Sequence, residues 1–171
     1  MPSFGVRVYK EYLNFACSHF LIFSDGTREP LHGHNYQVRV ELRGGIGAGD
    51  MVLDLCRLKP IVKQACDELD HRLLLPGRNP RLEVVEGEEV CEARYLPPGG
   101  QAERFVVPRK DVRVLPIANT STERLAEYLG ARLRAPVLAA AAGTPLETLT
   151  VEVEEAGGQC GLYQLELAGG R

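Results

Sequence analysis

The sequence lacks the features that mark several large classes of protein. No apolar run approaches the roughly 18 residues that a membrane-spanning helix needs, and the N-terminus carries no secretory pattern. The formal net charge is −3, and acidic and basic residues are interspersed without the basic stripe that nucleic-acid binding requires. We therefore expect a cytoplasmic protein that binds neither membrane nor nucleic acid.

Closely spaced cysteine pairs are also absent. The five cysteines include no C-x-x-C pair, so the sequence indicates neither a disulfide framework nor a cysteine zinc site. No internal repeat of solenoid length is present. With 171 residues, of which 44% are hydrophobic, the chain can bury a substantial core, and we expect a single domain over residues 1–171.

The most informative stretch is "LHGHNYQVRVEL", residues 31–42. Apolar and polar residues alternate from Tyr36 onward, which is typical of a half-buried strand. The same parity places His32 and His34 on the apolar face, where both imidazoles point the same way, as two ligands of one metal must. Taken alone, the pair could equally be polar residues at the end of a strand.

Other segments also have strand patterns. Residues 4–23 predict a strand that ends on His19, and a glycine-rich hairpin leads to a short strand over 51–53. Leu149, Val151 and Val153 alternate with polar residues before a Gly-Gly turn and a returning strand, which predicts a C-terminal hairpin.

Two segments have helical spacing. Apolar residues recur at intervals of three and four after Asp54, a plausible N-cap, and this helix continues into "ELDHRLLLPG". The second helix opens with a capping-box spacing from Thr120 to Glu123. Residues 76–117, between the helices, predict one or two inserted hairpins. This order of elements indicates an α+β domain with antiparallel pairs and helices on one face.

Three of the four histidines gather near the first two predicted strands. A hairpin would place these strands side by side, so His19 could join His32 and His34 in a three-histidine site with an open fourth position, as in catalytic zinc sites. The fourth histidine, His71, follows Asp70 directly, and an aspartate can hold the tautomer of an imidazole base. An Asp-His pair after a helix is also common as a cap or a surface turn.

Five motifs along the chain carry a family resemblance; in order they are "FACSHF", "LHGHNY", "LDHRLLLP", "NTSTERLAEYL" and "VEVEEAGG". Together, from about residue 4 to 165, they resemble the 6-pyruvoyl-tetrahydropterin synthase / 6-carboxytetrahydropterin synthase family. The resemblance implies the tunnelling fold (T-fold), in which an antiparallel four-stranded sheet carries two helices on one face. It also implies a Zn²⁺ ion bound by His19, His32 and His34, and a homohexamer built as a dimer of trimers.

The resemblance further implies roles for residues outside the histidine trio. Asp70 and His71 correspond to catalytic residues, and Glu155 corresponds to the glutamate that anchors the pterin ring. Strand alternation favours Glu155 over its neighbour, because it shares the inward parity of Val153. Two further residues, Thr122 and Glu123, match a segment beside the pterin pocket, although helix capping explains both without a ligand.

The sequence departs from the family at the catalytic cysteine. That cysteine precedes the H-G-H motif by four to six residues, where this chain has Gly26, Thr27 and Arg28. Cys17, on the strand that ends at His19, is a possible substitute without a motif behind it. Glu29 resembles instead the subgroup in which a glutamate replaces the cysteine. In that subgroup 7,8-dihydroneopterin triphosphate is converted largely to 6-hydroxymethyl-7,8-dihydropterin for folate-type synthesis.

Other functions stay open at this point. Within the family, the product could instead be 6-pyruvoyl-tetrahydropterin or 6-carboxytetrahydropterin. A catalytically silent relative could retain only zinc and pterin binding, as a sensor or scaffold. Outside the family, a cupin-like metal-binding β protein also uses a His-x-His pair on a strand.

Overall fold

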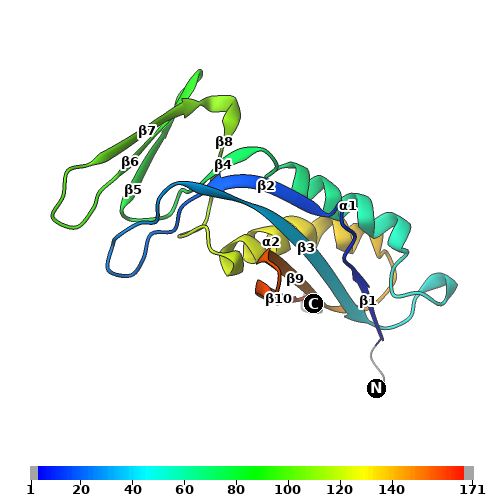
Figure 1. The fold of residues 1–171 in the computed structure, drawn as a ribbon. Coiled ribbons are helices and arrows are strands. Elements are labelled where there is room, and N and C mark those ends of the chain that lie inside the picture. Colours follow the sequence, from blue (N-terminus) through cyan, green and yellow to red (C-terminus); the bar gives the residue numbers. More distant parts are fainter. Residues whose placement is uncertain (1–3, 168–171) are drawn as a thin grey trace.

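The computed structural model describes residues 4–167 of the chain, and its main feature is a seven-stranded sheet (Figure 1). The strand order is β10-β9-β3-β2-β4-β8, and β1 pairs with the far end of β3. These strands are β1 (Phe4–Val8), β2 (Asn14–His19), β3 (His32–Gly44), β4 (Arg72–Pro76), β8 (Val112–Leu115), β9 (Leu146–Ala156) and β10 (Gln159–Glu166).

A second sheet of three antiparallel strands lies between the two helices in sequence. It comprises β5 (Leu82–Glu86), β6 (Val90–Tyr95) and β7 (Glu103–Pro108), joined by two hairpins as the sequence predicts for residues 76–117. Figure 1 shows this sheet to one side of the helices, beyond the ends of β4 and β8. Two 3-10 turns, η1 (Ala48–Asp50) and η2 (Arg109–Asp111), complete the connections.

The core lies between the large sheet and helices α1 (Leu55–Asp67) and α2 (Thr122–Ala140). The apolar parity of β3 faces this core, since Tyr36, Val38, Val40 and Leu42 are all fully buried. Val153, Val151 and Leu149 of β9 lie opposite the last three of these residues and are buried as well. Alternation therefore determines which face of the sheet the helices cover, and this part of the prediction is confirmed.

The helices begin close to their predicted positions. Asp54 caps α1 by accepting a hydrogen bond of 2.8 Å from the main-chain N–H of Cys56. On α2, Leu125, Leu129 and Leu133 recur at intervals of four residues and are all buried. The α+β class and the antiparallel set β10-β9-β3-β2 with both helices on one face agree with the expected fold. Neither helix in the described part of the chain is long and apolar enough to cross a membrane.

Three predictions of local structure were wrong. The N-terminal segment forms two strands, β1 and β2, because a turn at residues 11–12 separates them. Residues 51–53 form no strand and follow the η1 turn instead. The first helix ends at Asp67, and the leucines assigned to its end form β4, which pairs in parallel with β2 and β8.

The predicted capping box was also wrong by one residue. The N-cap of α2 is Ser121, whose hydroxyl accepts a hydrogen bond from the main-chain N–H of Arg124. Thr120 is fully buried, and its side chain points toward β2 instead of the helix terminus.

Candidate metal centre and active site

Three histidines converge where β2 ends and β3 begins. His19 and His32 are directly opposite each other in the antiparallel register, and His34 is two residues further along the same face of β3. The ring centroid of His19 lies 4.8 Å from that of His32 and 5.4 Å from that of His34. One ligand nitrogen from each ring lies within 4.8 Å of the others. The three histidines therefore lie together, as the sequence predicts.

Hydrogen bonds set the tautomers of two of these rings. The Thr120 hydroxyl donates to the main-chain oxygen of Phe20 at 3.0 Å, so its oxygen can accept from Nδ1 of His19, 3.2 Å away. Nδ1 of His32 lies 2.9 Å from the main-chain oxygen of Pro30, which can only accept. These Nδ1 contacts favour the tautomer of both rings that has its proton on Nδ1 and its lone pair on Nε2.

The electrostatics of the cluster also suit a metal. Burial lowers the pKa of His19, and the neighbouring imidazoles His32 and His34 lower it further, against the opposing charges of Glu155 and Glu29. Neutral imidazoles with oriented lone pairs are the donors that Zn²⁺ prefers. The residues present therefore fit a zinc ion held by three histidines.

A carboxylate and a phenol lie against the cluster. Oε1 of Glu155 is 3.3 Å from Nε2 of His34 and accepts a 3.0 Å hydrogen bond from the hydroxyl of Tyr36. That hydroxyl also lies 2.9 Å from Nε2 of His19, which competes with Oε1 for its single proton. Glu154, by contrast, pairs with Arg39. Glu155 thus faces inward, as alternation predicts, while sequence reasoning missed the contacts of Tyr36.

Glu29 lies in the loop from residue 20 to 31, which joins the strands that carry His19 and His32. Its Oε2 accepts a 3.0 Å hydrogen bond from the main-chain N–H of Leu21, and its own N–H donates to the Leu21 carbonyl at 3.0 Å. The carboxylate is therefore fixed by a residue two positions beyond His19. The Arg28 guanidinium does not pair with the Glu29 carboxylate, because it binds the carboxylate of Glu103 instead.

Asp70 and His71 form a hydrogen-bonded pair at the start of β4. The two oxygens of Asp70 bind Nδ1 of His71 at 2.8 Å and the main-chain N–H of Ala16 at 2.7 Å. Burial acts to raise the pKa of Asp70, but these hydrogen bonds outweigh it and hold that pKa below its usual range. The side chain of His71 is 81% exposed, and its φ of 53° lies in the left-handed region that non-glycine residues rarely adopt.

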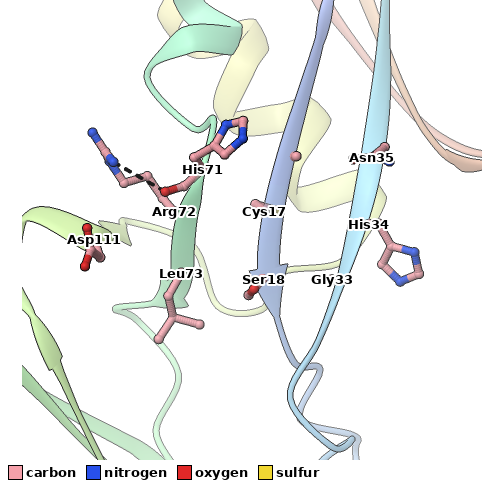
Figure 2. A pocket seen from close by; sticks show the side chains of 10 residues that line it. Cys17, Ser18, Gly33, His34, Asn35, His71, Arg72, Leu73 and Asp111 are labelled. Atoms are coloured by element: carbon pink, nitrogen blue, oxygen red, sulfur yellow. Dashed lines mark hydrogen bonds between the residues drawn. The ribbon is translucent and has the colours of Figure 1, made fainter.

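Within one chain, this pair is separated from the histidine cluster. Figure 2 shows His34 and His71 on opposite sides of β2, and both line an open groove of about 510 Å³. Among residues 4–167, no hydrogen bond or ion pair joins Asp70 or His71 to the trio. Thr122 and Glu123 occupy the first turn of α2, where the Thr122 hydroxyl lies 3.4 Å from Oε2 of Glu123.

The buried thiol of Cys17 is poorly suited to act as a nucleophile. Cys17 lies opposite His34 in the register, on the face that His19 shares, as alternation predicts. Burial raises the pKa of its thiol to about 12, and the charges of Asp70 and Glu155 add to this effect. Because the thiolate is the reactive form, Cys17 is a poor replacement for the missing catalytic cysteine.

The fold and this site define a class: an α+β protein whose sheet carries a three-histidine centre suited to a divalent metal, beside an inward carboxylate. A family model for 6-pyruvoyl tetrahydropterin synthase matches residues 7–166, and the chain belongs to this family. The family resemblance seen in the sequence is thereby confirmed.

Individual relatives agree with this assignment. A Methanocaldococcus jannaschii protein, provisionally named 6-carboxy-5,6,7,8-tetrahydropterin synthase, is 36% identical over 118 residues, which are 68% of each chain. The crystal structure of the 6-pyruvoyl tetrahydropterin synthase of Plasmodium vivax superposes with a TM-score of 0.86 at 28% identity, covering 97% of this chain and 99% of that one. The predicted T-fold is therefore confirmed.

The Plasmodium vivax protein has also been solved as two variants of a residue described as catalytic. In these variants a glutamate is replaced by alanine or by cysteine, and both superpose on this chain with a TM-score of 0.82 at 28% identity, covering 97% of this chain and 99% of theirs.

Proposed function

We propose that this protein is a zinc-dependent pterin synthase that acts on 7,8-dihydroneopterin triphosphate and cleaves its side chain to 6-hydroxymethyl-7,8-dihydropterin. The observation that carries this proposal is the position of Glu29. A carboxylate occupies the loop between the strands of His19 and His32, and Leu21 holds it in place. The catalytic glutamate described for the Plasmodium vivax relative supports the same chemistry here.

His19, His32 and His34 would hold the zinc ion. When bound, the metal would polarise the hydroxyl oxygens of the substrate side chain and lower their pKa. Thr120 and the Pro30 carbonyl would keep two of the three rings in the tautomer that presents Nε2 to the metal.

Glu155 would bind the pterin ring. A carboxylate can accept two parallel hydrogen bonds from the 2-amino group and N3 of a pterin. The Tyr36 hydroxyl already orients Oε1, and Oε2 has no hydrogen bond to any residue in the described part of the chain. Thr122 and Glu123 would lie beside the ring at the start of α2.

Glu29 and His71 would move protons at the side chain of the substrate. Since Nδ1 of His71 bonds to Asp70, its Nε2 is left as the basic atom. A homohexamer formed as a dimer of trimers would let the exposed His71 of one copy approach the histidine cluster of another. The separation of the two groups within one chain supports such a shared site.

The second candidate is a 6-carboxytetrahydropterin synthase, favoured by the names of relatives from Methanocaldococcus jannaschii and Haemophilus influenzae. Incubating the zinc-loaded protein with 7,8-dihydroneopterin triphosphate and separating the products by chromatography distinguishes the candidates. We expect 6-hydroxymethyl-7,8-dihydropterin as the main product. A 6-carboxy or 6-pyruvoyl product would replace the proposed activity with that of the corresponding synthase, and absence of turnover would indicate a silent relative.

A further inference from the structure

The three-stranded sheet β5–β6–β7 packs directly on the loop that carries Glu29. Phe20 and Ile22, at the beginning of that loop, are buried in a hydrophobic cluster with Leu82, Ala93 and Tyr95 of this sheet. This cluster is separate from the main core between the large sheet and the helices. It also includes Leu73, Leu75 and Val112 of β4 and β8, so the residues that follow His19 lie in a second core between the inserted sheet and the edge of the large sheet.

Arg28 is the main polar link between the loop and the inserted sheet. Its guanidinium carbon lies 5.3 Å from the ring centroid of Phe20, 5.6 Å from that of Tyr95 and 5.1 Å from that of Phe105. All three distances are within the range of cation–π attraction. Nε of Arg28 also binds Oε2 of Glu103 at 2.8 Å.

The same guanidinium reaches the backbone of Glu29. Nη1 of Arg28 donates to the main-chain oxygen of Glu29 at 2.6 Å. The side chain of Arg28 is 18% exposed, so a planar, five-donor group is held in a largely fixed orientation. Glu29 is thus held at its carbonyl by Arg28 and at its carboxylate by Leu21.

A second link lies at the tip of the loop. The Tyr95 hydroxyl donates a hydrogen bond to the main-chain oxygen of Gly26. Gly26 is buried with φ +87°, and a Cβ atom there would lie 2.5 Å from the guanidinium of Arg81. Close packing against the inserted sheet therefore fixes the loop at both Gly26 and Arg28.

We propose that Arg28 is a positioning residue, through which the inserted sheet β5–β6–β7 holds the loop of residues 20–31 in the geometry that aims Glu29 at the substrate. This inference rests on the proposed function, in which Glu29 transfers a proton. Arg28 itself points into the inserted sheet and takes no part in the chemistry. Its loss acts through the placement of Glu29, because small displacements of a catalytic group cost a large part of the rate.

The test compares Arg28→Met with a matched control. Met keeps a long apolar stem but removes the charge and all five donors. The control is Arg104→Met, because Arg104 lies on β7 and pairs with Glu92 at 2.6 and 2.7 Å, on the face opposite Phe105. We expect Arg28→Met to lower kcat by about 10- to 100-fold with KM and zinc content unchanged, and Arg104→Met to match the unsubstituted protein.

Hydrogen exchange supplies a readout that does not depend on turnover. The amide of Glu29 bonds to Leu21, and that of Gly26 bonds to Phe23. Both amides should exchange faster in Arg28→Met and remain protected in Arg104→Met. Arg28→Lys, which keeps the charge without the fork, should recover part of kcat and of the protection. If Arg28→Met fails to fold, Glu103→Gln is a milder variant that leaves the contacts of Arg28 with the aromatic rings intact. It should lower kcat and speed amide exchange as Arg28→Met does, by smaller amounts.

A double variant separates the failure of this inference from the failure of the proposed function. If Arg28 acts through Glu29, adding Arg28→Met to Glu29→Gln should lower kcat no further. An independent, multiplicative loss would overturn the positioning role. So would an Arg28→Met variant that matches Arg104→Met in kcat and exchange while Glu29→Gln is impaired. Full turnover by Glu29→Gln alone would instead overturn the role of Glu29, and the positioning role for catalysis would fall with it.

Discussion

The hydroxyl oxygen of Thr120 lies 3.2 Å from Nδ1 of His19, although 101 residues separate them in sequence. Thr120 is fully buried, and its hydroxyl proton is directed to the Phe20 carbonyl at 3.0 Å. The threonine therefore accepts from His19 and leaves Nε2 of that ring for a metal. Partners of this kind orient metal ligands without touching the metal.

Thr120→Val should weaken zinc binding by about 10- to 100-fold. Valine matches the shape of threonine but cannot accept a hydrogen bond from Nδ1, so the ring is free to adopt the other tautomer. Competition against a chromophoric chelator measures the affinity. Thr150→Val is the control, because the hydroxyl of Thr150 bonds to Gln164 on β10, away from the cluster. Equal zinc affinities for the two variants would contradict this role.

The metal ligands themselves can be tested by metal content. We expect about one zinc per chain in the unsubstituted protein and a large loss in His32→Ala, because two imidazoles alone make a weak site. His71→Ala should keep its zinc, since His71 lies across β2 from His34. Elemental analysis after dialysis gives the ratio, and full zinc in His32→Ala would exclude His32 as a ligand.

The parts of the fold that the sequence predicts are those with a clear period. The alternation of β3 and β9 and the helical spacing of α1 and α2 each appear in consecutive residues, so local pattern suffices. β4 was missed because Leu73, Leu74 and Leu75 are all buried, and a strand covered on both faces shows no alternation. The end of α1 was missed because no glycine marks it: its C-cap, Glu68, is in the right-handed region, and the left-handed residue, His71, comes three positions later.

In the candidate site, too, local patterns could be predicted and long-range contacts could not. His19, His32 and His34 could be predicted together because a hairpin joins their strands. The contact between Tyr36 and Glu155 spans 119 residues and depends on the pairing of β3 with β9, which periodicity does not specify. Thr120 fits a capping box by spacing, yet Ser121 is the N-cap. Sequence spacing located the helix N-cap to within one position, but it could not identify the buried partners of Thr120 or Tyr36.

Acid should destabilise the metal-free protein through His19. Burial lowers the pKa of this imidazole in the folded state, so the unfolded chain takes up its proton first as the pH falls. The contribution of neutral His19 to the free energy of unfolding is therefore fully present above the pKa of the unfolded state, about 6.5. It is lost as the pH falls toward the lower pKa of the folded state. Urea unfolding midpoints with chelator at pH 7.5 and 5.5 measure this loss. His19→Gln should show a smaller loss between these pH values, and an equal one would contradict the assignment.

The free edges of the large sheet favour assembly. Within the described chain, β10 pairs only with β9, so its outer edge presents unpaired main-chain groups. Pairing between copies would remove such edges and build closed rings. We expect a particle of six times the 18.8 kDa chain mass by light scattering at micromolar concentration. A monodisperse monomer would contradict both the hexamer and the site shared between copies.

Glu29→Gln tests the residue on which the proposed chemistry depends. Glutamine keeps the size of the side chain, and its oxygen can still accept from the Leu21 N–H, but it cannot take up a proton. Turnover should therefore fall by about 10²-fold or more, while zinc and pterin binding stay nearly unchanged. Glu88→Gln, in the exposed turn between β5 and β6, is the control for loss of one charge.

Glu29→Cys extends this test to the choice of product. A thiol in the same loop would restore the type of base that the cysteine enzymes use, so we expect the product to shift toward 6-pyruvoyl-tetrahydropterin. Chromatography of the reaction mixture measures the ratio of the two pterins. Near-normal turnover in Glu29→Gln, together with an unchanged product ratio in Glu29→Cys, would show that Glu29 only supports the loop through Leu21 and that another group moves the proton.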